Sequence, residues 1–325
     1  MPSFVGVLLK PLFRSFGIAL ALAGAVFVSL NLAREWSVIR PALIGVAPMW
    51  LLSSLVTGLL SLGGIATVWG MALKIVGIPV PVRTALRWFF VGELGKYVPG
   101  GIWAVVGRAE ISVRGGAGRT QAYAAVALSL SLTYLAGAVV ALALLPSHGQ
   151  ALSGEFWPLW LVLFVAVGVV GVHPRVMRMG FVLSGRLFRR SIPFEPPPWR
   201  VSLQMIMMLL PCWVGIGLSV WMVAQGLGAE VELLEIIFAG VLAWVMGFLV
   251  VPAPSGLGVR EGVFILAAGS LSSGVAAAVA VLARVVFVIA DLMGAALAVI
   301  IDRSPIREEA GGGLDDSPRE EGGNR

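Results

Sequence analysis

Long apolar runs are the feature that most limits how this chain can fold. A helix needs about 20 apolar residues to cross the hydrocarbon core of a bilayer. Six runs of about that length can be read in the sequence, at 12–32, 46–73, 120–145, 156–173, 201–225 and 275–301. Only 12% of the 325 residues are charged, whereas about a quarter of a soluble domain is charged. The chain is therefore predicted to be an all-α polytopic membrane protein with about six full transmembrane helices.

The first run follows Lys10 and Arg14, as the apolar core of a signal peptide would. Its hydrophobic stretch, 16–32, is longer than such a core, and no clear small-residue cleavage site precedes Arg34. We therefore interpret this run as the first transmembrane helix.

The charges between the runs predict the orientation of the chain. The connection 74–119 carries seven Lys or Arg residues and two acidic residues. The connection 174–200 carries six arginines and one acidic residue. Cytoplasmic loops are rich in Lys and Arg, so both are predicted to be cytoplasmic, whereas 146–155 and 226–235 carry no Lys or Arg and are predicted to face outside. Both termini then lie in the cytoplasm of a multi-pass protein of the plasma membrane. The formal charge of +6 thus reflects topology, and we expect no binding of nucleic acid.

Two further apolar stretches are interrupted by proline and glycine. The stretch 84–110 contains YVPGGIW at 97–103, and the stretch 233–268 contains VPAPSGLG at 251–258. A helix cannot continue through these sequences without losing backbone hydrogen bonds, and at membrane depth such backbone survives only inside protein or beside water. Each stretch is predicted to be a re-entrant pair of half-helices. The alternative is that 233–251 forms an ordinary seventh span.

The two broken stretches also predict an internal repeat. Aligning Pro99 with Pro254 gives an offset of 155 residues (254 − 99), which places the second apolar run on the fifth and the third on the sixth. Each half then has three full spans and one broken element. Because three is odd, the second half is inverted relative to the first, as in inverted-repeat transporters. The predicted units are a first membrane repeat at 1–150, a second at 151–301, and a disordered cytoplasmic tail at 302–325 that is too polar to order itself.

Charged residues lie at both breaks and in the last run. The glycines after Pro99 can turn backbone N–H groups towards an anion at the start of a half-helix, with Lys96 and Arg108 on either side. The alternative is that these two cations only anchor an interfacial helix. At the second break, Arg260 and Glu261 are costly in an apolar stretch unless they are paired or in contact with water or substrate.

In the last run, Arg284 and Asp291 are seven residues apart and lie on one helix face. They are either functional or form an ion pair that holds the bundle together. The predicted substrate-binding residues of the whole chain are Glu93, Lys96, Pro99, Gly100, Gly101, Arg108, Glu110, Pro254, Gly256, Gly258, Arg260, Glu261, Arg284 and Asp291.

The two breaks resemble the signatures of a known family. GKYVPGGIW, followed by a Gly-Arg that ends at Arg108, and PAPSGLGVREG at 252–262 are similar to motifs of the membrane region of lysylphosphatidylglycerol synthases and their stand-alone flippase-like relatives. Ser255 stands where a glycine is common in the family. The resemblance implies movement of an anionic or aminoacylated phospholipid, or of a lipid-linked sugar, between leaflets. No aminoacyl-transferase domain follows the membrane region, so lysyl transfer from tRNA is not expected.

Two other functions stay open at this point. A membrane-embedded transferase, or an accessory subunit of lipid or glycolipid synthesis, would need a positioned base and usually a metal; its candidate residues are Glu93, Glu110, Glu261 and Asp291. A structural partner of lipid-synthesis enzymes would need none of these charges. We expect no enzymatic activity, no cofactor and no metal. The expected partners are membrane lipids with an anionic headgroup, and enzymes of lipid synthesis are candidates.

The cysteine and histidine content bears on metal binding. Cys212 is the only cysteine, and His148 and His173 are far apart in the sequence. Neither residue type therefore predicts a metal cluster.

Overall fold

The computed structural model describes residues 45–98, 102–145, 173–187, 195–249 and 258–303, together with the single positions 166, 170 and 171. Within these residues every regular element is a helix and there is no strand. The predicted span 12–32, almost all of the span 156–173, and the tail from 304 lie outside the described residues. The prediction of about six spans therefore stays a prediction for these two runs.

Four helices are long and apolar enough to cross a bilayer: α3 (Pro48–Ile75), α6 (Arg119–Ala143), α9 (Trp199–Gly226) and α12 (Ser273–Ile301). They have 25 to 29 residues, or about 38 to 43 Å at the rise of an α-helix, which exceeds the hydrocarbon thickness of about 30 Å. They coincide within a few residues with the second, third, fifth and sixth predicted runs. The protein is therefore a multi-pass membrane protein, and the regular elements of its described residues are all helices.

Both broken stretches form pairs of shorter helices. In the first hairpin, α4 (Val82–Glu93) leads into a 3-10 turn, η1 (Leu94–Tyr97), and α5 (Trp103–Arg114) packs back on α4. In the second hairpin, α10 (Leu233–Leu249) packs on α11 (Val259–Ala267). α10 has 17 residues and spans about 25 Å, which is shorter than the hydrocarbon core and does not favour an ordinary seventh span.

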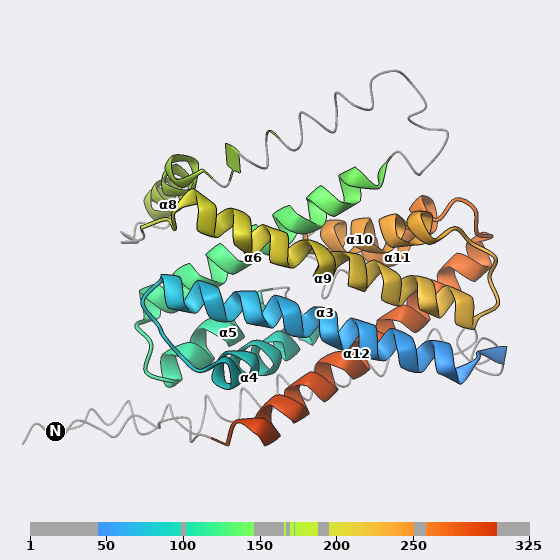
Figure 1. Cartoon of the computed structure of the whole chain (residues 1–325), viewed down its shortest axis with the longest axis horizontal. Coiled ribbons are helices and arrows are strands. Elements are labelled where there is room, and N and C mark those ends of the chain that lie inside the picture. Colours follow the sequence, from blue (N-terminus) through green and yellow to red (C-terminus); the bar gives the residue numbers. More distant parts are fainter. Residues whose placement is uncertain are drawn as a thin grey trace, which may run out of the picture.

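The long helices run in opposite directions in pairs (Figure 1). α3 and α9 are antiparallel, because the start of α3 meets the end of α9, where the Ala47 N–H donates to the Gly226 carbonyl at 3.1 Å. α6 and α12 likewise run in opposite directions (Figure 1). The first hairpin lies towards one end of the bundle, where α8 (Pro174–Leu187) also lies, and the second hairpin lies towards the other end (Figure 1).

The packing of one half has a counterpart in the other. α3 packs on α4, α6, α9 and α12, and α9 packs correspondingly on α10, α12, α3 and α6. α4 contacts α3, α5 and α12, whereas α10 contacts α9, α11 and α6. α5 then leads to α6, as α11 leads to α12. In this comparison α3 corresponds to α9, α4 to α10, α5 to α11 and α6 to α12. Each of these helix contacts in one half then has a counterpart in the other.

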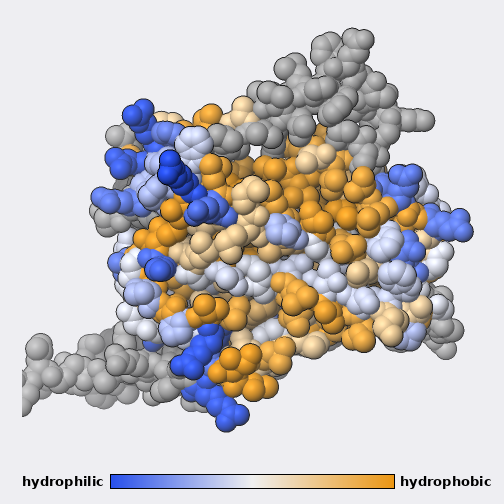
Figure 2. Space-filling view, in the orientation of Figure 1, coloured by the Kyte–Doolittle hydropathy of each residue, from blue (hydrophilic) through white to orange (hydrophobic). Residues whose placement is uncertain are grey.

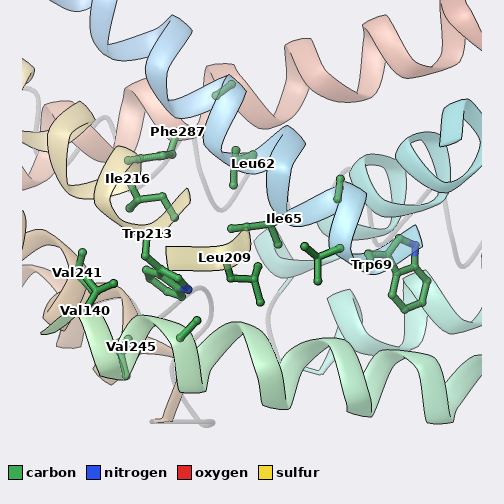
Figure 3. Close-up of a cluster of buried hydrophobic side chains, with 14 of the residues drawn as sticks. Leu62, Ile65, Trp69, Val140, Leu209, Trp213, Ile216, Val241, Val245 and Phe287 are labelled. Atoms are coloured by element: carbon green, nitrogen blue, oxygen red, sulfur yellow. The ribbon is translucent and has the colours of Figure 1, made fainter. Parts of the chain in front are cut away.

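Close packing between α3, α6 and α9 forms the centre of the bundle, where Trp69, Leu209 and Trp213 are buried (Figure 3). The indole N–H of Trp213 donates to the Thr133 carbonyl at 2.6 Å. Gly137 of α6 makes room for this ring, because a Cβ there would lie 2.5 Å from it. The ring of Trp213 thus buries its polar atom against α6.

Two serines join α3 and α9 reciprocally. The Ser54 hydroxyl donates to the Ser219 carbonyl at 2.8 Å, and the Ser219 hydroxyl donates to the Ser54 carbonyl at 2.9 Å. Small residues and interhelical hydrogen bonds of this kind are typical of helix contacts in membranes, where lipid supplies no hydrophobic driving force.

The surface matches a bilayer environment. Large apolar patches lie above and below a band of weakly polar residues across the visible face, and the most hydrophilic residues lie towards its two ends (Figure 2). Leu60 of α3 and Met207 of α9 are 71% and 65% exposed, as expected of side chains that face lipid tails. The orientation of the termini stays a prediction.

Candidate functional site

A pocket lies between the second hairpin, α9 and α12, and the end of the first hairpin closes one wall. Its charged lining residues are Lys96 from η1, Arg260 and Glu261 from α11, and Arg284 from α12. The aromatic rings of Tyr97, Trp244 and Phe287 also line it. Residues separated by almost 200 positions therefore meet at one site, which combines both broken stretches with the last span.

The charged residues of α12 lie near the middle of that helix. Its central residue is Phe287, so Arg284 and Asp291 are three and four residues away, or about 4.5 and 6 Å along the axis. Charges at this depth are costly and need partners. The two residues do not pair with each other, since each has a partner on a different hairpin.

Asp291 pairs with the end of the first hairpin. Its side chain is fully buried, and one carboxylate oxygen lies 2.7 Å from the Lys96 ammonium. The Tyr97 hydroxyl donates to the same oxygen. This contact fixes η1 against α12, so the first hairpin and the last span form one wall of the pocket.

Glu93 connects Lys96 with Arg108. One Glu93 oxygen lies 3.5 Å from the Lys96 ammonium, and the other lies 3.6 Å from Nε of Arg108. Arg108 is only 3% exposed and stacks between helices, with its guanidinium 5.4 Å from the Phe89 ring centre and 5.7 Å from that of Trp69. Arg108 is therefore inside the first hairpin and does not line the pocket.

Arg260 has a different environment. Its guanidinium lies 3.8 Å from the ring centre of Trp244, within the range of a cation–π contact. In the part of the chain that the structure describes, no carboxylate lies within salt-bridge distance of it. Arg260 therefore presents an unpaired positive charge to the pocket.

Glu261 is held at both of its oxygens. One accepts a hydrogen bond from Arg284 at 2.6 Å, and the other accepts one from the Gly258 N–H at 2.8 Å. The second contact caps the start of α11, where Gly258 has a φ of +78°, a conformation that glycine adopts without strain. Glu261 thereby neutralises Arg284 and orders the helix start that carries Arg260.

The structure does not bring all predicted site residues together. Glu110 lies where α5 meets α6, and it accepts hydrogen bonds from Arg119 at 3.1 Å and from the Tyr123 hydroxyl at 3.0 Å. The predicted residues Pro99, Gly100, Gly101, Pro254 and Gly256 lie outside the described residues. The roles of all fourteen predicted residues in substrate binding stay predictions.

The sequence did not predict any of the four aromatic residues of the pocket, Tyr97, Trp244, Phe264 and Phe287. Tyr97 lies within the quoted motif but carries no charge, and Trp244 lies in a stretch that reads as plain hydrophobic helix. The predicted repeat contains a signal for Trp244. Phe89 precedes Gly92 by three residues as Trp244 precedes Gly247, and both pairs are offset by 155 residues (244 − 89 and 247 − 92).

Metal binding finds no support among the described residues, where no three His, Cys, Asp or Glu side chains are grouped closely enough to hold an ion.

Comparison with known proteins gives one family. The family described as lysylphosphatidylglycerol synthase TM region matches residues 15–298. No curated protein sequence matches the chain. The family match confirms the resemblance of the two motifs, and it includes both hairpins and every residue of the pocket.

Proposed function

Because the chain belongs to the lysylphosphatidylglycerol synthase transmembrane family, we propose that it moves a lipid with a phosphate-bearing headgroup between the leaflets of the membrane. The observation that carries this proposal is the pocket near the middle of α12, where the Arg260 guanidinium has no carboxylate partner in the described structure. A phosphate is a suitable ligand, because a guanidinium binds its oxygens with charge-assisted hydrogen bonds. The lipid tails would remain in the bilayer.

We also propose that the two halves are inverted repeats. α3 and α9 start and end 151 residues apart (199 − 48 and 226 − 75), and the exchangeable packing contacts support a common fold. The hairpins lie towards opposite ends of the bundle (Figure 1), which is what inversion requires. In inverted-repeat transporters the substrate site lies at the interface between the repeats near the bilayer midplane. The pocket supports this proposal, because it lies near the middle of α12 and is lined by residues from both halves.

The pairing of charges suggests how each residue contributes. Arg260 and Lys96 line the pocket and would face the phosphate. Arg108 and Glu93 would act from behind, since Glu93 lies between Arg108 and Lys96. When a phosphate approaches, Lys96 can exchange part of its contact with Asp291 for the ligand. That exchange would loosen the attachment of the first hairpin to α12 and so couple binding to movement of the two halves.

Both termini are proposed to be cytoplasmic, in the plasma membrane. The end of the bundle that holds the first hairpin carries exposed bases, among them Arg83, Arg175 and Arg200. The segment 226–235 at the opposite end carries three glutamates and no Lys or Arg. This asymmetry is the one that the positive-inside rule associates with a cytoplasmic end.

We propose transport without a catalytic step. Glu261, the only carboxylate among the described lining residues of the pocket, has both oxygens engaged. A general base needs a free oxygen within hydrogen-bond reach of the reacting proton. The described pocket offers none, which supports transport over transferase chemistry.

Purified protein in vesicles with a fluorescent phospholipid in one leaflet tests the proposal. Replacing Arg260 by Ala should slow transbilayer movement about 10- to 100-fold, the effect of losing a hydrogen bond to a charged group. Arg200→Ala, which removes an exposed charge at the start of α9, is the matched control and should retain the wild-type rate. Equal rates in Arg260→Ala and wild type would contradict the proposed function.

A further inference from the structure

We propose that the pocket selects a lipid headgroup that carries a net negative charge and no amine, and that Arg260 is the residue that determines this selectivity. The inference rests on the proposed function in taking the ligand to be a lipid. It goes further, because lipid transport alone leaves anionic and aminoacylated headgroups equally open. The selectivity follows from the charges around the pocket, because two of its three lining cations already have a carboxylate partner.

The described wall of the pocket has a surplus of one positive charge. Of the three cations that line the pocket, Lys96 lies 2.7 Å from Asp291 and Arg284 lies 2.6 Å from Glu261. Behind the wall, Arg108 and Glu93 also form a pair. Among the described residues this leaves Arg260 as the unmatched charge, and the neighbouring segment 250–257 contains no acidic residue. A site with one surplus positive charge at membrane depth is stabilised by a ligand with one negative charge.

The described lining of the pocket has no carboxylate with an oxygen free to receive an ammonium group. Both oxygens of Glu261 accept hydrogen bonds from Arg284 and the Gly258 N–H. Asp291 is fully buried and does not line the pocket. Lys96 and Tyr97 share one of its oxygens. The other oxygen has no hydrogen-bond partner among the described residues, but it is buried out of reach of a headgroup in the pocket. A headgroup amine would have to displace one of these contacts and release another buried charge, which is strongly unfavourable.

Arg260 is held in place by the ring of Trp244. Trp244 meets Trp213 edge to face at 6.3 Å and Phe287 at 4.9 Å between ring centres, so its ring is fixed by neighbours on two helices. Arg260 stacks on this ring, and its side chain also covers Gly247. Stacking uses the face of the guanidinium and leaves the N–H groups at its edge free to bind a phosphate. Trp244 is therefore a positioning residue for Arg260.

Three headgroups with matched acyl chains separate the possibilities: phosphatidylglycerol with charge −1, phosphatidylethanolamine with charge 0, and lysylphosphatidylglycerol with charge +1. Native mass spectrometry of the full chain with an equimolar mixture measures their relative binding. We expect phosphatidylglycerol to be preferred about 10- to 100-fold over the other two, the effect of one hydrogen-bonded charge. Equal or tighter binding of lysylphosphatidylglycerol by the wild-type protein would overturn the inference.

Variants at Arg260 make the assignment specific. Arg260→Gln should reduce the preference to about 1:1, Arg260→Glu should reverse it in favour of the lysyl headgroup, and Arg200→Gln should leave it unchanged. If Arg260→Gln does not fold, Trp244→Phe keeps the charge and weakens the stacking, because Trp is the strongest cation–π partner, and should reduce the preference partially. If Arg260→Gln folds and keeps the full preference for phosphatidylglycerol, the role of Arg260 is contradicted. If Arg260→Gln does not fold, a full preference in Trp244→Phe contradicts it.

Two further arms separate this inference from its premise. Glycerol phosphate at the concentration of the lipid should not displace phosphatidylglycerol, and full displacement would show that the ligand is a soluble phosphate. Transport without headgroup selectivity would refute the selectivity alone. Selective binding without any transport would refute the proposed function and leave the binding site standing.

Discussion

The two hairpins contain the same local arrangement and use it for different ends. In the first, Arg108 of α5 packs over Gly92 of α4; in the second, Arg260 of α11 packs over Gly247 of α10. In both, a Cβ on the glycine would lie within 2.5 Å of the arginine side chain. Each arginine also stacks near an aromatic ring three residues before its glycine. Both hairpins therefore contain a contact between a glycine, an aromatic ring and an arginine, as the proposed repeat predicts.

The difference lies in what surrounds each arginine. Arg108 is 3% exposed and has Glu93 as a partner, whereas Arg260 lines the pocket with no carboxylate partner in the described structure. A buried pair holds a hairpin together, and an unpaired cation beside a pocket attracts an anion. One acidic residue, Glu93, thus distinguishes the paired Arg108 from Arg260, the arginine that we propose to bind the ligand. Its counterpart at the offset of 155 is Phe248.

The largest difference is expected when each arginine is removed in turn. Arg108→Gln removes one of the two cations beside the Glu93 carboxylate, which keeps Lys96 at 3.5 Å, and should cost about 1.5 to 3 kcal/mol of folding stability. Arg260→Gln removes an unmatched charge and should leave stability unchanged or slightly higher, while transport slows about 10- to 100-fold. Thermal unfolding of both variants in the same detergent measures this. Equal destabilisation by the two changes would remove the distinction between the hairpins.

The two glycines provide a second contrast. A Cβ on Gly92 would lie 2.7 and 2.8 Å from backbone atoms of Arg108, whereas the close neighbours at Gly247 are flexible side-chain atoms of Arg260. Gly92→Ala should therefore cost about 2 kcal/mol through overpacking that the backbone cannot relieve. Gly247→Ala should fold normally but displace Arg260, and so reduce the binding of phosphatidylglycerol. Unfolding temperatures and native mass spectrometry together check this, and a stable Gly92→Ala protein would contradict the reason given.

A third change tests the contact that links the first hairpin to the last span. Asp291→Asn removes the charge opposite Lys96, which still has Glu93 at 3.5 Å, so the expected loss of stability is only about 1 to 1.5 kcal/mol. The freed Lys96 should bind phosphate more tightly, and the expected signature is stronger lipid binding together with slower transport. Glu261→Gln is the comparison in the second hairpin, since it frees Arg284. Weaker lipid binding in Asp291→Asn would argue against the proposed exchange of partners.

Much of the fold was accessible from the sequence because the bilayer imposes strong constraints. Apolar length alone located α3, α6, α9 and α12 within a few residues, and the Pro-Gly breaks located both hairpins. The partners of the charges were not accessible. The contact of Lys96 with Asp291 joins residues 195 positions apart (291 − 96), and only the packing of η1 against α12 creates it.

Glu110 shows the limit for single residues. In the sequence it follows Arg108 by two positions and looks equivalent to Glu93. Residues two apart on a helix point away from each other, so Glu110 turns towards α6 while Arg108 turns towards α4. The charges near a motif therefore predicted which hairpin contributes to the candidate site. Which of these charges point towards the site depends on the helix face on which each residue lies.

The smallest effect is expected outside both hairpin centres. Arg119 pairs with Glu110 at 3.1 Å, but its side chain is 64% exposed. An exposed pair contributes about 0.5 kcal/mol or less, and its partner Glu110 keeps the Tyr123 hydroxyl. Arg119→Gln should therefore shift the unfolding temperature by at most a degree or two and leave headgroup preference as in wild type. If it lowered the preference as much as Arg260→Gln, selectivity would arise from the total positive charge of the protein and not from the second hairpin.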